Sequence, residues 1–145
     1  MFRFLLFIFI LTTSFPQTID ERLLLIETQK ILAYGDTFEQ IAIERVEEYA
    51  VASNVTNSIV RSLNIIMNTY HLIHIYNMIE GEEDKMKVGD YLRGRITHTS
   101  RLLKTEVKLA TRFTSSSKSK QIKDITELYF KSLDFVIKLL DNFSW

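Results

Sequence analysis

Apolar residues recur three or four positions apart through most of this chain, and the residues that interrupt helices are scarce. Proline occurs once and glycine four times in 145 residues. Folds rich in strands need turn residues about every 8–12 positions, which this chain does not supply. The spacing and the composition together predict an all-α fold, an antiparallel helical bundle of about four helices, two of them long.

The predicted helix ends follow from capping signals. Two possible capping boxes, at 18–21 and at 36–39, lie on either side of Gly35. In each box a Thr or Asp could accept from the backbone while a Glu three residues later reaches back to the cap. Glycine is also common just beyond the last residue of a helix. We therefore expect a first helix over 18–34, a stop at Gly35 and a second helix over 37–80.

Polar and turn residues predict the remaining helix boundaries. Polar residues at 53–57 compete for backbone hydrogen bonds, so the second helix is expected either to bend or to break briefly there. A Gly-Glu-Glu-Asp turn at 81–84 precedes a third helix over 84–113, and a Ser-rich connector leads to a fourth over 120–143. Because these connections are short, neighbouring helices are expected to run antiparallel.

The first residues have the order of a secretory signal peptide. Arg3 supplies a positive charge, residues 4–11 are apolar, and residues 12–14 are small and polar. The apolar run is shorter than the roughly 20 residues that span a bilayer as a helix. We expect residues 1–17 to be a signal peptide and residues 18–145 a single helical domain. The protein would then be periplasmic or secreted, without a transmembrane anchor once the signal is removed.

Formal charge is balanced overall but unevenly distributed. The 18 basic and 18 acidic residues cancel, which argues against a general nucleic-acid binder. Residues 20–50 contain eight acids and three bases, a net of −5, whereas residues 85–120 contain two acids and ten bases, a net of +8. The expected third helix carries a basic stripe of Arg101, Lys104, Lys108 and Arg112. This stripe either pairs with neighbouring helices or forms a patch for an anionic partner.

The expected second helix carries a polar stripe that is almost uncharged. Residues 62–79 contain no Asp, Glu, Lys or Arg. A solvated helix face normally carries charged residues, so the stripe has two interpretations. It either lies inside the bundle or forms an interface with a partner protein or a second copy, where Asn can fix the register. Its members are Asn54, Asn57, Arg61, Asn64, Asn68 and His71.

Motifs for catalysis or metal binding are missing from the sequence. There is no Gly-x-Ser-x-Gly, no P-loop and no His-Glu-x-x-His. His71 and His74 share a helix face, but a zinc site needs three or four ligands and His98 is expected on another helix. The adjacent carboxylates at 82–84 diverge around a helix and do not form a facing acid–base pair. We expect no catalytic residue, no metal and no cofactor.

The leading hypothesis is an exported, noncatalytic helical protein that acts through protein–protein contacts, as a component of an envelope assembly. One alternative is a helical carrier of an apolar or lipid-like ligand, because the expected core is rich in Ile, Leu and Phe. Another follows from architecture alone. Long amphipathic helices behind a signal peptide resemble periplasmic subunits of bacterial conjugation and type IV secretion machines, which implies an accessory role in such an apparatus.

Overall fold

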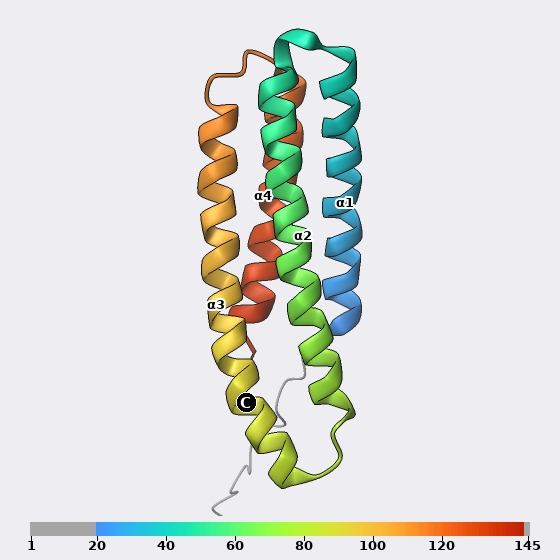
Figure 1. Cartoon of the computed structure of the whole chain (residues 1–145), viewed down its shortest axis with the longest axis vertical. Coiled ribbons are helices and arrows are strands. Elements are labelled where there is room, and N and C mark those ends of the chain that lie inside the picture. Colours follow the sequence, from blue (N-terminus) through green and yellow to red (C-terminus); the bar gives the residue numbers. More distant parts are fainter. Residues whose placement is uncertain (1–19, 144–145) are drawn as a thin grey trace, which may run out of the picture.

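The computed structural model describes residues 20–143, which form four antiparallel helices (Figure 1). The helices are α1 (Glu21–Glu44), α2 (Tyr49–Met78), α3 (Glu82–Thr114) and α4 (Lys120–Asp141). A short 3₁₀ turn, η1 (Val46–Glu48), joins α1 to α2. Each helix packs mainly against two others in the cyclic order α1, α2, α3, α4, so α1 and α3 occupy opposite corners. The predicted all-α bundle is confirmed, whereas the predicted signal peptide lies outside the described residues.

The core repeats every seven residues along the helices. Seven is close to two helical turns, so these positions form one seam, as in coiled-coil packing. Tyr129 and Phe38 are the largest of the fully buried side chains. The seven-residue series are Leu24, Ile31 and Phe38 on α1, Ile59, Ile66 and Ile73 on α2, Ile96, Leu103 and Ala110 on α3, and Ile122, Tyr129 and Val136 on α4.

The first helix begins two residues later than a cap at Thr18 would place it. Asp20 is the N-cap, and its carboxylate accepts from the backbone N–H groups of Arg22 and Leu23 at 2.9 and 3.2 Å. A carboxylate in this position satisfies two backbone donors and favours the positive end of the helix dipole. The prediction that Thr18 caps the first helix was therefore wrong, and Thr18 itself lies outside the described residues.

The predicted break at Gly35 was also wrong, because α1 continues through it to Glu44. Gly35 is buried, and a Cβ atom built there would lie 3.1 Å from Cγ2 of Ile59 on α2. The glycine therefore allows α1 to approach α2 closely instead of ending the helix. The second helix consequently starts at Tyr49 and not at Thr37, after the extended backbone of Arg45 (φ −129°, ψ 91°).

A short break at 53–57, one of the two outcomes expected there, does not occur, since α2 is helical throughout this stretch. Ala52 and Val55 are buried against the rest of the bundle, and the hydroxyl of Thr56 donates to the carbonyl of Ala52 at 3.0 Å. Packing of one face thus outweighs the weak helix propensity of the polar residues between. Over the residues described, none of the helices combines the length and apolar character needed to cross a membrane.

Candidate functional site

The polar stripe of α2 lies on the outside of the bundle. All six members are exposed, on the side of the helix opposite the buried residues Ile59, Ile66 and Ile73. The stripe therefore does not face the interior of its own chain, and its amides are open to solvent or to a partner. The members are Asn54, Asn57, Arg61, Asn64, Asn68 and His71.

The outer face of α2 differs from the other helices in charge. The 30 residues of α2 include a single Lys, Arg, Asp or Glu, which is Arg61. The 22 residues of α4 include eight such residues, placed mostly on its exposed side. Both helices are corners of the same bundle and expose an outer half to water. Helix α2 alone covers that half with amides, histidines and apolar groups.

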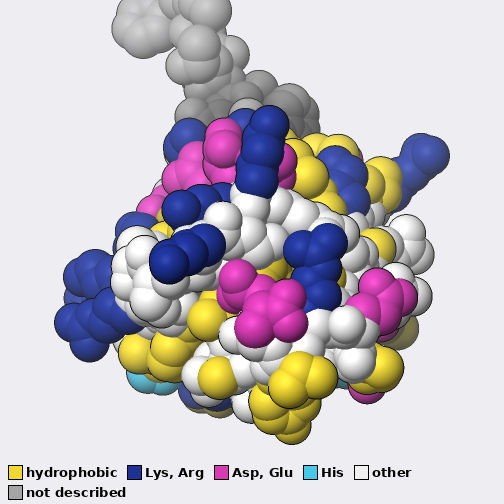
Figure 2. All heavy atoms as spheres, turned by 90° about the horizontal axis from the view of Figure 1, so that it is seen from above, with side chains coloured by type: hydrophobic (Ala, Val, Ile, Leu, Met, Phe, Trp, Pro, Cys, Tyr) yellow, Lys and Arg dark blue, Asp and Glu magenta, His cyan; other side chains and the backbone are white. Residues whose placement is uncertain are grey.

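Exposed apolar side chains accompany the stripe. Val60, Ile75 and Met78 on α2 are 49, 53 and 68% exposed. Where α1 passes into α2, Ile43 and Val46 are 75 and 84% exposed, and Figure 2 shows hydrophobic side chains open at this end of the bundle. A hollow of about 400 Å³ lies beside them. Its lining residues are Glu39, Ala42, Ile43, Tyr49, Ser53, Thr56, Asn57 and Val60.

The single charge on this face is neutralised from within the bundle. Nε and Nη2 of Arg61 donate to the two carboxylate oxygens of Glu106 on α3 at 2.9 and 3.0 Å. Glu106 is buried, and the hydroxyl of Ser58 also donates to it at 2.7 Å. The hydrogen bond to Glu106 raises the pKa of Arg61 above its ordinary value, against the opposing effect of burial. Arg61 therefore adds little net charge to the surface.

Further hydrogen bonds link the buried surroundings of Glu106 to Tyr129 on α4. The hydroxyl of Tyr129 lies 2.8 Å from Ser62 Oγ and 3.4 Å from Ser58 Oγ. Burial raises the pKa of Tyr129, despite the lowering effect of these two hydrogen bonds. The cluster connects α2, α3 and α4 and so fixes the rotation of α2 about its axis. Our sequence analysis missed it, although Glu106 falls on the apolar spacing of α3 with Thr99, Leu103 and Ala110.

The basic stripe of α3 is exposed along its length and does not pair with acidic α1, which lies at the opposite corner. Lys104 forms an ion pair with Asp141 of α4 at 3.1 Å. Arg101, Lys108 and Arg112 form none within the described part of the chain. In the end-on view of Figure 2, basic side chains project at the left edge, the side on which Figure 1 shows α3.

Of the two histidines of α2, His74 forms a contact with another helix. Nδ1 of His74 lies 2.9 Å from one carboxylate oxygen of Glu21, and Asn77 donates to the other oxygen at 2.6 Å. These contacts join the end of α2 to the start of α1. Among residues 20–143, no group of three His, Asp or Glu is placed to hold a metal ion.

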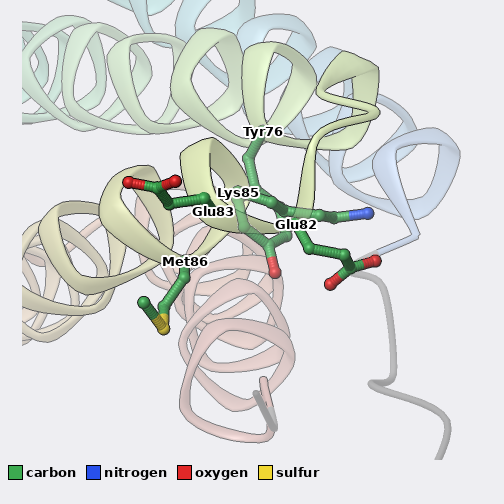
Figure 3. A pocket seen from close by; sticks show the side chains of 5 residues that line it. All are labelled: Tyr76, Glu82, Glu83, Lys85 and Met86. Carbon is green, nitrogen blue, oxygen red and sulfur yellow. The ribbon is translucent and has the colours of Figure 1, made fainter.

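A second hollow, of about 480 Å³, lies at the turn between α2 and α3 (Figure 3). Figure 3 shows the carboxylates of Glu82 and Glu83 directed to opposite sides of the helix start. Nζ of Lys85 lies 5.4 Å from the centre of the Tyr76 ring, within the range of a cation–π contact. The two carboxylates therefore do not converge on a common point where a substrate atom could sit.

Comparisons of the chain with known protein families, with curated proteins and with solved structures found no match.

Proposed function

We propose that this chain is an exported, noncatalytic helical protein that works by binding another protein through the outer face of α2. One observation carries the proposal. A helix of 30 residues at the corner of a bundle bears one formal charge, and that charge is paired inward with Glu106. Charged residues are depleted at the centres of protein interfaces, where they would lose their hydration.

The outer face of α2 suits a partner whose surface also combines apolar and uncharged polar side chains. Val60, Ile75 and Met78 offer apolar contact area, whereas Asn57, Asn64 and Asn68 offer donors and acceptors between them. Each amide left unpaired in an interface would cost about 1–3 kcal/mol, so the partner must supply matching polar groups. This requirement gives the contact a defined register, as a buried Asn does between helices.

We place this function above that of a carrier for an apolar ligand. A carrier needs a cavity among the core side chains. These hollows open at the surface instead, and the residues of the seven-residue seam are buried. The order of residues 1–14 supports export, which would put the partner in the cell envelope or outside the cell. An accessory role in a secretion apparatus is one form that such a function could take.

The test is capture of the partner with charge added to the face. Asn64→Lys with Asn68→Lys places two ammonium groups on the outer face of α2, where they remain solvated in the free protein. Gln29→Lys with Gln40→Lys adds the same charge to exposed amides of α1. Proteins recovered with each form from the native source would be compared by mass spectrometry. We expect the α2 variant to lose its partner and the α1 variant to retain it. Equal recovery with both variants would contradict the proposal.

A further inference from the structure

The α3–α4 side of the bundle contains a groove with an apolar floor and a cationic rim. The groove has a volume of about 410 Å³ and is lined by Lys104, Val107, Lys108, Phe130, Asp134 and Ile137. Asp134 is paired with Lys138 at 2.6 Å, and Lys104 with Asp141. Lys108 forms no ion pair within the described part of the chain. The rim on the α3 side thus keeps a positive charge available to a partner.

The opposite corner of the molecule carries the complementary chemistry. Leu32, Asp36, Glu39 and Ile43 follow one another at intervals of four, three and four residues, so they form one stripe on α1. Leu32 is 52% exposed and Ile43 75%. Asp36 and Glu39 are exposed as well, and neither forms an ion pair among residues 20–143. Two carboxylates therefore lie between two apolar side chains.

The two surfaces also match in length. The α1 stripe covers twelve residues from Leu32 to Ile43, and the basic stripe of α3 covers twelve from Arg101 to Arg112. The eleven steps from the first residue to the last correspond to about 16 Å along a helix. The carboxylates of Asp36 and Glu39 are one turn apart, as are the ammonium groups of Lys104 and Lys108. A helix laid along the groove could thus pair one carboxylate with Lys108 and place the other beside Lys104, which already contacts Asp141, while its apolar residues contact the floor.

We propose that α1 of one copy docks in the α3–α4 groove of a second copy. Asp36 and Glu39 of the first copy then face Lys104 and Lys108 of the second. Because α1 and α3 occupy opposite corners, one copy can use both surfaces at once. Such a head-to-tail contact repeats and closes into a ring or extends into a chain. The contact uses none of the six residues of the α2 stripe, although Glu39 and Ile43 also line the hollow beside that stripe.

The test measures the mass of the protein in solution as a function of concentration and salt. We expect the mass of the full chain to rise with concentration at about 0.05 M salt and to fall at about 0.5 M, where charges are screened within a few ångströms. Lys104→Glu with Lys108→Glu, and separately Asp36→Lys with Glu39→Lys, should each weaken association at least tenfold. Lys118→Glu with Lys120→Glu makes the same charge reversal at exposed positions near the α3–α4 connection and should leave association unchanged.

A variant that restores charge complementarity distinguishes the loss of a direct contact from damage to the fold. A chain carrying all four reversals has complementary surfaces again and should associate as the original does. Circular dichroism should show the same helix content for every form, since the four positions are exposed. A chain that stays monomeric at ~1 mM and low salt would overturn the proposal. So would failure of the four-residue variant to associate, or loss of association in Asn64→Lys with Asn68→Lys, which alters only α2.

Discussion

Arg61 on α2 donates two hydrogen bonds, of 2.9 and 3.0 Å, to the carboxylate of Glu106 on α3. The two residues are 45 positions apart in the sequence. The carboxylate is buried, whereas the guanidinium side chain remains 47% exposed. The pair holds the outer face of α2 in a fixed orientation relative to the rest of the bundle. A surface held in this way is already arranged for a partner, which reduces the entropy lost on binding.

Replacement of Arg61 and replacement of Glu106 should lower the free energy of unfolding by different amounts. Arg61→Ala leaves a buried carboxylate with only Ser58 as a donor, and we expect a loss of about 2–3 kcal/mol in the free energy of unfolding. Glu106→Gln removes the buried charge and keeps a hydrogen-bonding group, so the loss should be about 1 kcal/mol. Urea unfolding followed by circular dichroism measures both. An equal or smaller loss for Arg61→Ala would show that the carboxylate finds solvent or another donor.

Substitutions at two glycines should change the stability of the protein in opposite directions. Gly94 lies within α3, exposed, with nothing within 4 Å of a built Cβ atom. Gly94→Ala should therefore stabilise the protein by up to ~1 kcal/mol, through helix propensity alone. Gly35→Leu should destabilise it by about 1–3 kcal/mol, because its Cβ would already lie 3.1 Å from Ile59 Cγ2. Thermal melting of both variants tests the close approach of α1 to α2, which a raised melting temperature for Gly35→Leu would refute.

Acid should weaken the hydrogen bonds that Glu21, at the start of α1, and Asp141, at the end of α4, accept from other helices. Burial opposes ionisation of Glu21, but hydrogen bonds from Asn77 and His74 outweigh it and lower its pKa from the ordinary 4.5. A hydrogen bond from Ser100, assisted by Lys104, lowers the pKa of Asp141 from 3.8. Lowered carboxylate pKa values give stability that is present above these ordinary values and lost as the pH falls through the folded ones.

The variant Asp141→Asn tests this pH dependence. It removes one of the carboxylates whose pKa is lowered in the folded protein, so the decline in the free energy of unfolding below about pH 4 should become shallower. Denaturant unfolding of the variant and of the original chain across the acid range measures the difference. Identical slopes would mean that Asp141 ionises in the folded protein as it does in the unfolded chain.

The sequence predicted the all-α bundle because apolar spacing is set by the core, and the core decides this fold. The third and fourth helices were placed within two residues at each end, since Gly81 and the Ser-rich connector interrupt the pattern. The first connection was misplaced because Gly35 is used for packing against Ile59, a relationship that only the tertiary structure reveals. The real end of α1, near Arg45, carries neither Gly nor Pro.

The candidate site was predictable in part. Spacing alone places Asn57, Asn64 and Asn68 on one side of a helix, because periodicity gives relative angles. It does not say whether that side faces the core or the solvent, and the structure places it outside. The partner of Arg61 was not predictable, since Glu106 is distant in sequence and its burial depends on how α2 and α3 align.

Site-specific photocrosslinking in the native cell would show directly whether another protein binds the outer face of α2. A photoreactive amino acid would replace Asn57, Asn64 or Asn68 on the outer face of α2, with Gln29 and Gln40 on α1 as exposed controls. We expect a discrete crosslinked product with another protein from each α2 position and none with that protein from the α1 positions. Crosslinks of equal yield to that same protein from both helices, or none from α2, would contradict the assignment of this face as the binding surface.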